Sequence, residues 1–196
     1  MEHYNVDFKK RYGQNFLKRK AVVERIADVC SLTDKDLVIE VGPGGAILTQ
    51  ELAKRAGHVL AYEIDTDLQG ELHRKLENCS NVEVLFQDFL TSSLEQDISR
   101  FSYQNLYFVS NVPYYITTPI IMKIIDSHLN FQKICMMVQK EVAERLAGIH
   151  GGKEIGSITY SINYYTNPEI IINVPRNSFI PAPNVDSACL LYTSPS

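Results

Sequence analysis

Five short apolar runs, rich in β-branched and aromatic residues, constrain the fold more than any other feature of the chain. They are residues 37–41, 59–62, 82–86, 106–109 and 134–138. Several of these runs are continuously apolar rather than alternating, which is typical of strands buried on both faces. The pattern therefore predicts an α/β fold in which helices cover both faces of a mostly parallel sheet.

Helix-like segments separate most of these runs, and a pair of later strands follows them. We expect helices near residues 20–30, 47–56, 66–76, 118–126, 140–147 and 157–165. The last two predicted strands, residues 170–174 and 186–191, have no long helix between them. This spacing predicts an antiparallel hairpin at the edge of the sheet.

The chain has 196 residues, of which 45% are hydrophobic, and this is enough for one core. No stretch approaches the roughly 20 apolar residues that a membrane-spanning helix needs, and the start of the chain is polar. The four cysteines form no C-x-x-C pair and the five histidines lack ligand spacing. We therefore expect a soluble, cytoplasmic protein with buried thiols, no bound metal and no membrane contact.

The first 25 residues are basic although the whole chain carries a net charge of -4. Seven cations face three anions there, a net charge of +4, which leaves -8 for the remaining residues. A basic segment before an acidic body is either a solvated surface or a contact for nucleic acid. The candidate RNA contacts are Lys9, Lys10, Arg11, Lys18, Arg19 and Lys20.

A glycine-rich turn follows the first strand, at residues 40–46, and residue 47 then begins a helix. Glycines let such a turn approach a ligand closely, so Gly42 and Gly44 are candidate cofactor contacts. Glu63 ends the second strand 19 residues after Gly44, close to the interval at which an acid reaches ribose hydroxyls in nucleotide-binding folds. The alternative is an ordinary turn beside an exposed acid, because the spacing G-x-G-x-x-G is missing.

Asp88 follows the third strand and is expected at the same edge of the sheet. Its carboxylate can accept a hydrogen bond from an adenine amine, although Asp is also common after strands as a helix cap.

The tetrapeptide Asn111-Val112-Pro113-Tyr114 follows the fourth strand and is the most informative motif. An exocyclic adenine amine is a poor nucleophile because its lone pair is delocalised into the ring. The Asn111 side-chain carbonyl and a backbone carbonyl held by Pro113 can accept both amine hydrogens and favour a pyramidal nitrogen. Tyr114 can stack on an unpaired base. The alternative is a simple Asn-x-Pro turn with a packed tyrosine.

With these motifs, the chain resembles the KsgA-type small-subunit rRNA adenine dimethylases from residue 11 to about residue 188. The resemblance rests on residues 13–17, 40–46, 63–65, 87–88, 111–114, 139–146 and 179–188. It implies a seven-stranded, Rossmann-like class I methyltransferase and S-adenosylmethionine as cofactor. The implied cofactor contacts are Gln14, Asn15, Leu17, Gly42, Gly44, Glu63, Ile64, Asp88, Phe89 and Asn111. The implied target-base site comprises Asn111, Pro113 and Tyr114, with Phe179 as a second aromatic wall.

The resemblance also implies the reaction and the domain organisation. The expected reaction is N6,N6-dimethylation of two adjacent adenosines near the 3′ end of small-subunit rRNA, within a pre-ribosomal particle and by a monomer. We expect a basic arm at residues 1–25 that packs on the cofactor site, a methyltransferase domain at 26–192 and a tail at 193–196. The helical C-terminal domain of the family is expected to be absent. Ala46 stands where relatives have a glycine, which we expect to tighten the turn, and Val112 replaces a leucine.

Three alternatives remain. An Erm-type enzyme would modify large-subunit rRNA with a similar site, although residues 139–146 favour the KsgA type. A non-catalytic RNA- or DNA-binding relative could keep the fold, but the intact Asn111, Pro113, Tyr114 and Glu63 argue against it. A nicotinamide-dependent oxidoreductase shares the glycine loop and the ribose-binding acid. It lacks the G-x-G-x-x-G spacing and leaves residues 111–114 unexplained.

Overall fold

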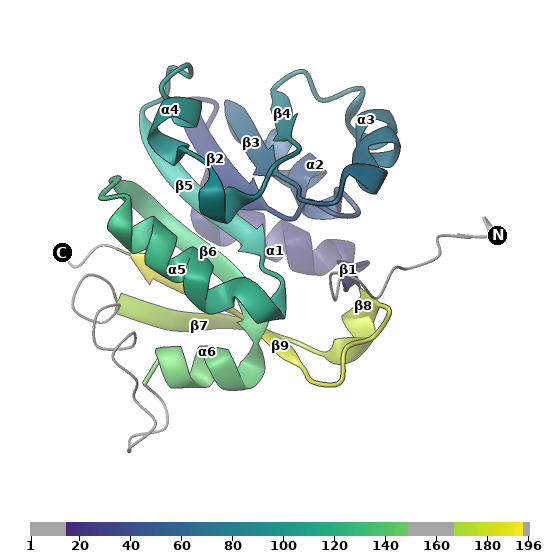
Figure 1. The fold of residues 1–196 in the computed structure, drawn as a ribbon. Coiled ribbons are helices and arrows are strands. Elements are labelled where there is room, and N and C mark those ends of the chain that lie inside the picture. Colours follow the sequence, from purple (N-terminus) through teal and green to yellow (C-terminus); the bar gives the residue numbers. More distant parts are fainter. Residues whose placement is uncertain (1–14, 149–166, 194–196) are drawn as a thin grey trace.

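The computed structural model describes residues 15–148 and 167–193. Within these residues, seven strands form one sheet in the order β4-β3-β2-β5-β6-β9-β7 (Figure 1). The strands are β2 (Asp36–Val41), β3 (His58–Tyr62), β4 (Val82–Leu85), β5 (Asn105–Asn111), β6 (Phe131–Gln139), β7 (Asn167–Val174) and β9 (Ser187–Thr193). Strands β2 to β6 are parallel, and β9 is antiparallel to both β6 and β7. The predicted α/β sheet and its edge hairpin are therefore confirmed.

Helices cover both faces of the sheet, as the continuously apolar strands predict. On one face lie α4 (Leu94–Ile98), α5 (Thr117–Asp126) and α6 (Lys140–Leu146), which stand in front of the strands in Figure 1. On the other lie α1 (Lys20–Cys30) and α2 (Ile47–Ala53), with α3 (Gln69–Leu76) packed beside β4. Short 3-10 turns, η2 (Thr66–Leu68), η3 (Phe89–Thr91), η4 (Tyr114–Ile116) and η5 (Arg176–Ser178), connect these elements.

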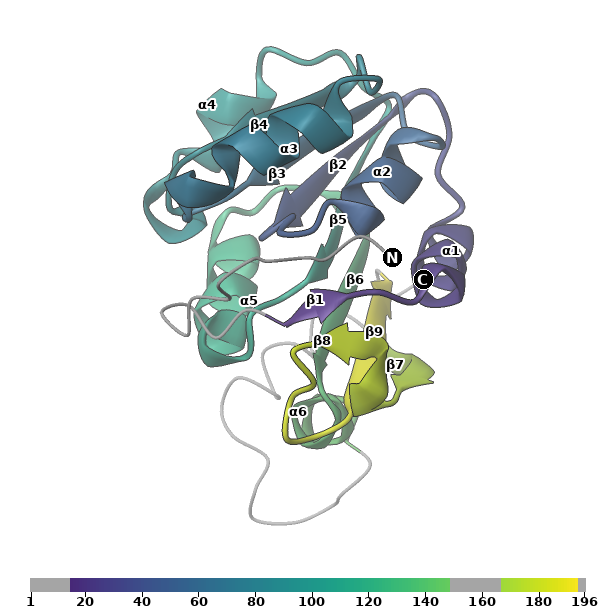
Figure 2. The ribbon, with the colours of Figure 1, turned by 90° about the vertical axis from the view of Figure 1, so that its right-hand side faces the viewer.

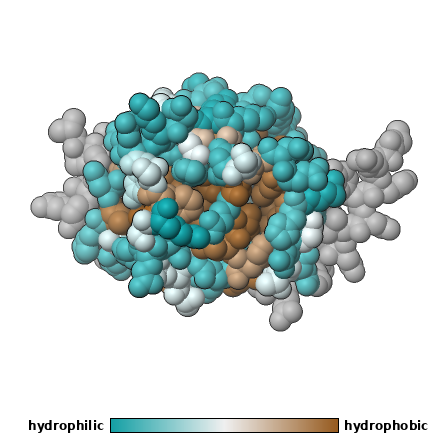
Figure 3. Space-filling view, turned by 90° about the horizontal axis from the view of Figure 1, so that it is seen from above, coloured by the Kyte–Doolittle hydropathy of each residue, from teal (hydrophilic) through white to brown (hydrophobic). Residues whose placement is uncertain are grey.

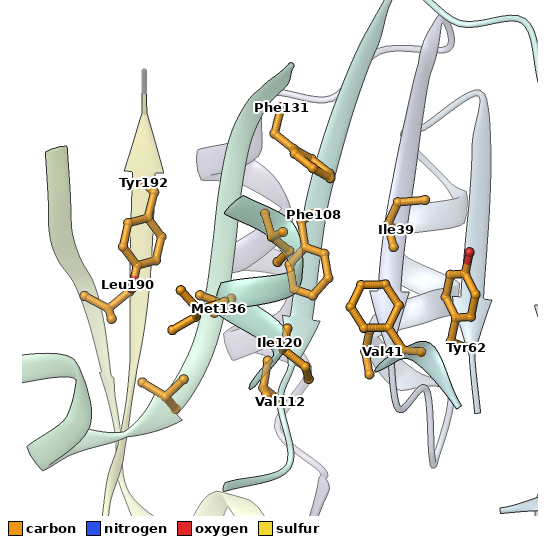
Figure 4. Close-up of a cluster of buried hydrophobic side chains, with 14 of the residues drawn as sticks. Ile39, Val41, Tyr62, Phe108, Val112, Ile120, Phe131, Met136, Leu190 and Tyr192 are labelled. Atoms are coloured by element: carbon orange, nitrogen blue, oxygen red, sulfur yellow. The ribbon is translucent and has the colours of Figure 1, made fainter. Parts of the chain in front are cut away.

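Alternate strand residues point to opposite faces, so each strand contributes to two cores. Leu37 and Ile39 pack with α4, α5 and α6, whereas Val38 packs with α1 and α2. Figure 4 shows part of the first core, where Phe108 and Ile120 meet between the sheet and α5. In the view of Figure 3, polar side chains cover most of the molecule and apolar side chains gather in the middle. No helix in the described ranges is long and apolar enough to span a membrane.

A second, two-stranded sheet joins the start of the described chain to its end. β1 (Phe16–Leu17) pairs antiparallel with β8 (Phe179–Ile180), and the pair lies side by side in Figure 2. The amide of Lys18 extends the ladder by donating to the Ser178 carbonyl at 2.9 Å. This pairing holds residues 15–17 at the carboxyl end of the parallel strands, where they take part in the site described below.

The remaining differences from the sequence predictions have local causes. α2 ends at Ala53 rather than residue 56, and the chain then passes close to the Asp34 carbonyl oxygen at Gly57, where a Cβ atom would lie 2.3 Å from it. A separate 3-10 turn precedes α3, and the Asp65 side chain caps it. Neither α4 nor the β1–β8 pair was predicted. The predicted helix at 157–165 lies outside the described residues.

Cys30, Cys135 and Cys189 are buried and Cys79 is half-buried.

Candidate methyl-transfer site

A cavity of about 210 Å³ lies at the carboxyl ends of β2, β3 and β5 and just beyond the end of β4. Its wall includes β1, the glycine turn after β2, and the residues that follow the three other strands. Of the residues predicted from the sequence, Asn15, Leu17, Gly42, Gly44, Glu63, Ile64, Asp88, Phe89, Asn111, Pro113 and Tyr114 line this cavity. The sheet thus brings together side chains up to 99 positions apart, as expected for the switch point of a doubly wound fold.

The ends of these strands are fixed to one another by hydrogen bonds that continue the sheet. The Gly42 amide donates to the Tyr62 carbonyl at 2.8 Å, and the Glu63 amide donates to the Leu85 carbonyl at 3.0 Å. The buried Ser110 hydroxyl donates to the Val41 carbonyl at 2.7 Å. The three bonds hold the glycine turn, the acid and the tetrapeptide in a fixed relative position.

Glu63 is a buried acid of the cavity, and backbone amides hold both of its carboxylate oxygens. Its side chain is 1% exposed, and each carboxylate oxygen accepts one backbone N–H, from Gly44 at 3.2 Å and from Asp65 at 2.9 Å. Burial raises the pKa of Glu63, and the backbone amides of Asp65, Gly44 and Ile64 oppose this shift. Because a carboxylate oxygen has two lone pairs, both oxygens can still accept a hydroxyl hydrogen from a ligand.

The turn between β2 and α2 requires glycine at its closest approach to β1. Gly44 has φ of +48°, and a Cβ atom there would lie 2.8 Å from Cε1 of Phe16. Gly42 also has a positive φ, +73°. The turn therefore presents bare backbone to the cavity, as a site for a large ligand requires. Ala46 ends the turn with φ of +62°, a left-handed position that favours glycine, and the expected tightening of the turn stays a prediction.

Glu40, near the end of β2, is a second buried acid of the cavity to which no sequence motif assigns a role. Its side chain is 1% exposed and lines the cavity, and its Oε2 has no hydrogen-bond partner among the described residues. Burial raises the pKa of Glu40 to about 8, helped by the Glu63 carboxylate, whereas the nearby Thr49 hydroxyl lowers it. Glu40 is thus a buried acid that favours its protonated form.

Asp88 both caps a turn and faces the cavity. Its Oδ1 accepts the Leu90 amide at 2.9 Å at the start of η3, which is the capping role that the sequence left open. Its Oδ2 can still accept a donor from a ligand. Phe89, 3% exposed, packs its ring edge-on against Tyr62 at a centroid distance of 5.1 Å and supports this turn.

The amide of Asn111 is oriented by the chain segment that precedes β1. Its Nδ2 donates to the Asn15 carbonyl at 3.4 Å, so its Oδ1 is the remaining acceptor. The Val112 amide donates to the Met137 carbonyl at 3.1 Å and extends β5 toward Pro113. The tetrapeptide is therefore held on two sides, by β6 and by the residues before β1.

Tyr114 is half-buried, and its hydroxyl lies 2.6 Å from the Ser187 hydroxyl at the start of β9. Burial raises the pKa of Tyr114, so the hydroxyl stays neutral. This bond fixes the hydroxyl end of a side chain that lines the cavity. Ser187 was not singled out from the sequence, because the contact spans 73 positions.

Phe179, the second aromatic wall that the resemblance implies, is the first residue of β8. Its side chain is 1% exposed and packs in the core beneath α1 and α2, opposite Leu17 in the β1–β8 pair. It is not among the residues that line the cavity, and its role as a second aromatic wall stays a prediction. Tyr115, which no sequence motif indicates as a site residue, lines the cavity and is 58% exposed.

The predicted RNA contacts are only partly described. Lys9, Lys10 and Arg11 and the predicted cofactor contact Gln14 lie outside the described residues. Lys18, Arg19 and Lys20 are exposed directly after β1, and Lys20 pairs with Glu24 at 3.2 Å. Within the described ranges, Lys18 and Arg19 form no salt bridge, so their charges are available to an anionic partner.

Comparisons with known proteins agree with this geometry. The sequence profile of the ribosomal RNA adenine dimethylase family matches residues 5–191. The chain is 42% identical over 192 residues to the ribosomal RNA small subunit methyltransferase A of Anoxybacillus flavithermus, and 45% identical over 193 residues to that of Ligilactobacillus salivarius. Each match covers 97% of this chain and 65% of the relative, so the chain spans about two thirds of the length of these relatives.

Solved structures give the same fold. A dimethyladenosine transferase from Plasmodium falciparum superposes with a TM-score of 0.80 at 27% identity, covering 92% of this chain and 63% of the other. The 23S rRNA methyltransferase ErmE also superposes with a TM-score of 0.80, at 32% identity, covering 93% of this chain and 70% of the other. The sheet is therefore that of a class I methyltransferase, and the chain belongs to the ribosomal RNA adenine dimethylase family.

Proposed function

We propose that this chain transfers methyl groups from S-adenosylmethionine to the N6 amines of two adjacent adenosines near the 3′ end of small-subunit rRNA. The observation that carries the proposal is the convergence of Glu63, Asp88 and the tetrapeptide at residues 111–114 on one cavity. The small-subunit substrate is supported by relatives at 42–45% identity that are named ribosomal RNA small subunit methyltransferase A.

The residues of the cavity fit the cofactor. Both Glu63 oxygens are fixed by backbone donors and can accept the two ribose hydroxyls of an adenosyl group. The Oδ2 atom of Asp88 can accept the adenine amine, and the bare backbone at Gly42 and Gly44 leaves room for the rest of the molecule. When bound, S-adenosylmethionine supplies an electrophilic methyl group on a sulfonium.

Asn111 activates the target amine in this proposal. Its Oδ1 accepts one amine hydrogen, and a backbone carbonyl of the 112–113 segment accepts the other. The two bonds draw the nitrogen lone pair out of conjugation with the ring. Because Asn15 already orients the Asn111 side-chain amide and β6 holds the next backbone amide, little reorganisation is needed when the base arrives.

Tyr114 positions the target base. Its ring offers a stacking surface to a base that has left its helix, and the Ser187 bond keeps the ring from turning away. No strong general base is required, because the proton of the methylated amine can leave to water.

The basic residues at the start of the chain supply contacts to the RNA backbone. Lys18 and Arg19 follow β1 directly, and β1 is part of the cavity wall. Neutralising phosphates at this position would hold the RNA strand next to the site where the base enters. The remaining predicted contacts, Lys9, Lys10, Arg11 and Lys20, extend the same segment.

An Erm-type specificity for large-subunit rRNA is the second candidate, because the ErmE structure superposes as well as the dimethyladenosine transferase does. The test is to incubate the chain, in excess, with methyl-labelled S-adenosylmethionine and either small or large subunits that lack the modification. Label in the small-subunit rRNA supports the proposal. Label confined to the large-subunit rRNA would favour the Erm type, and cofactor binding without transfer to either particle would favour a non-catalytic relative.

A further inference from the structure

A single aromatic ring stands exposed at the mouth of the cavity. Five large hydrophobic side chains in the described ranges are well exposed: Ile64, Tyr115, Met122, Ile180 and Val185. Two of them, Ile64 and Tyr115, also line the cavity, and Tyr115 is the most exposed of the five at 58%. An exposed ring in itself is common on protein surfaces, but its place next to Tyr114 at the edge of a cavity is informative.

Tyr114 and Tyr115 project their side chains in different directions. They are consecutive residues of the 3-10 turn η4, in which successive side chains project about 120° apart. Tyr114 is half-buried and its hydroxyl contacts that of Ser187, whereas Tyr115 is 58% exposed. We therefore assign the Tyr114 ring to the base inside the cavity and the Tyr115 ring to a part of the RNA that stays outside it.

The backbone beneath Tyr115 is fixed. The Ile116 amide donates to the Pro113 carbonyl at 3.1 Å, and the buried Thr117 hydroxyl donates to the Tyr114 carbonyl at 3.4 Å. The turn then runs directly into α5, whose first residue is Thr117. Tyr115 thus carries a largely exposed aromatic ring on a fixed backbone.

We propose that Tyr115 is a stacking platform for the nucleobase next to the target adenosine in the RNA strand; this inference rests on the proposed function. When a base leaves its stack to enter a cavity, the neighbouring base loses a stacking partner at the rim. An aromatic side chain at that point replaces the lost partner. Such stacking tolerates any base, so Tyr115 raises affinity for the strand without selecting its sequence.

The test pairs a protein variant with an RNA that lacks one base. We would use a short single-stranded RNA with one adenosine flanked by non-adenine nucleotides, and two versions with an abasic nucleotide on the 5′ or the 3′ side of that adenosine. Binding would be followed by fluorescence anisotropy for the unmodified chain, Tyr115→Ala, Tyr115→Phe and Met122→Ala. Met122→Ala is the matched control, because Met122 is an exposed apolar residue on α5 that does not line the cavity.

The expected loss for Tyr115→Ala on the intact RNA is about 5- to 150-fold, which corresponds to about 1–3 kcal/mol. Tyr115→Phe keeps the ring and should bind within about twofold of the unmodified chain, as should Met122→Ala. On one of the two abasic RNAs, the unmodified chain should lose a similar factor and Tyr115→Ala should add no further loss, because the stacking pair is already broken.

The proposal is overturned if Tyr115→Ala binds the intact RNA as well as the unmodified chain does, or if its loss is the same on all three RNAs. Failure of the unmodified chain to bind the intact RNA would also overturn it. These outcomes concern binding alone. Absence of methyl transfer to small subunits, with the coupling between Tyr115 and the neighbouring base intact, would instead reject the proposed reaction.

Discussion

Glu40 makes the stability of the protein depend on pH in a direction that a single substitution can reveal. The carboxyl is buried at the end of β2, its Oε2 has no partner among the described residues, and burial raises its pKa to about 8 from an ordinary value of 4.5. Between these two values, the folded protein holds a proton on Glu40 that the unfolded chain has released. Raising the pH therefore favours unfolding.

The size of the stability change follows from the interval between the two pKa values of Glu40. Each pH unit between the two pKa values removes about 1.4 kcal/mol from the free energy of unfolding. From pH 5 to pH 7.5 the loss is about 3 kcal/mol, and water that enters on ionisation would make it smaller. Glu40→Gln has nearly the same shape and cannot ionise, so it should match the unmodified protein near pH 4.5 and be more stable by an increasing margin above pH 5.

The assay is urea unfolding followed by circular dichroism at half-unit steps from pH 4.5 to 8, for the unmodified chain and Glu40→Gln. The difference between the two curves cancels the other titrating groups. Glu95→Gln removes a carboxyl from the exposed surface of α4 and serves as the matched control. Parallel stability curves for Glu40→Gln and the unmodified chain would refute the reasoning, because they would mean that Glu40 ionises as readily in the folded state as in the unfolded one.

Three further predictions concern the site. Glu63→Ala should weaken S-adenosylmethionine binding about 10- to 150-fold, since hydrogen bonds to a charged acceptor contribute roughly 1.5–3 kcal/mol, and unchanged calorimetric affinity would reject the ribose contact. Asn111→Ala should lower the single-turnover methylation rate much more than it lowers cofactor affinity, so a rate within a few-fold of the unmodified enzyme would count against amine activation. Replacing both Lys18 and Arg19 by alanine should reduce the salt dependence of RNA binding by up to about two phosphate contacts, whereas Lys35→Ala, at the other end of β2, should leave it unchanged.

The sheet and the edge that carries the site were predictable because their signals are local. Continuously apolar runs identify parallel strands, and all parallel strands end at the same edge. If the runs at residues 37–41 and 106–109 are parallel strands of one sheet, Gly42 and Asn111 lie at the same edge of that sheet. The structure brings them together around one cavity, and the roles assigned to them remain predictions.

The burial of Phe179 could not be predicted because it depends on a pairing between distant segments. Phe179 pairs with Leu17 across 162 positions, in strands of only two residues each, which leave no periodic pattern. The motif around Phe179 indicates an aromatic residue near the site. Only the three-dimensional pairing shows that its ring is buried in the core and that Tyr115 is the exposed ring.

Glu40 and Ser187 were missed for related reasons. Glu40 belongs to the glycine motif by sequence, but its ionisation depends on Glu63, 23 positions away, and on complete burial. Ser187 acts through its bond to Tyr114, which exists only because β9 returns beside β6. Contacts of this kind follow from the topology and cannot be read from spacing along the chain.

The identity of the methylated nucleoside tests the central claim most directly. Small subunits that lack the modification would be incubated with the chain in excess and S-adenosylmethionine, the rRNA digested, and the nucleosides separated and weighed by mass spectrometry. We predict N6,N6-dimethyladenosine at two adjacent positions near the 3′ end of the small-subunit rRNA. A methyl group on any other base or on another atom of adenosine, or the absence of any methylated nucleoside, would contradict the account.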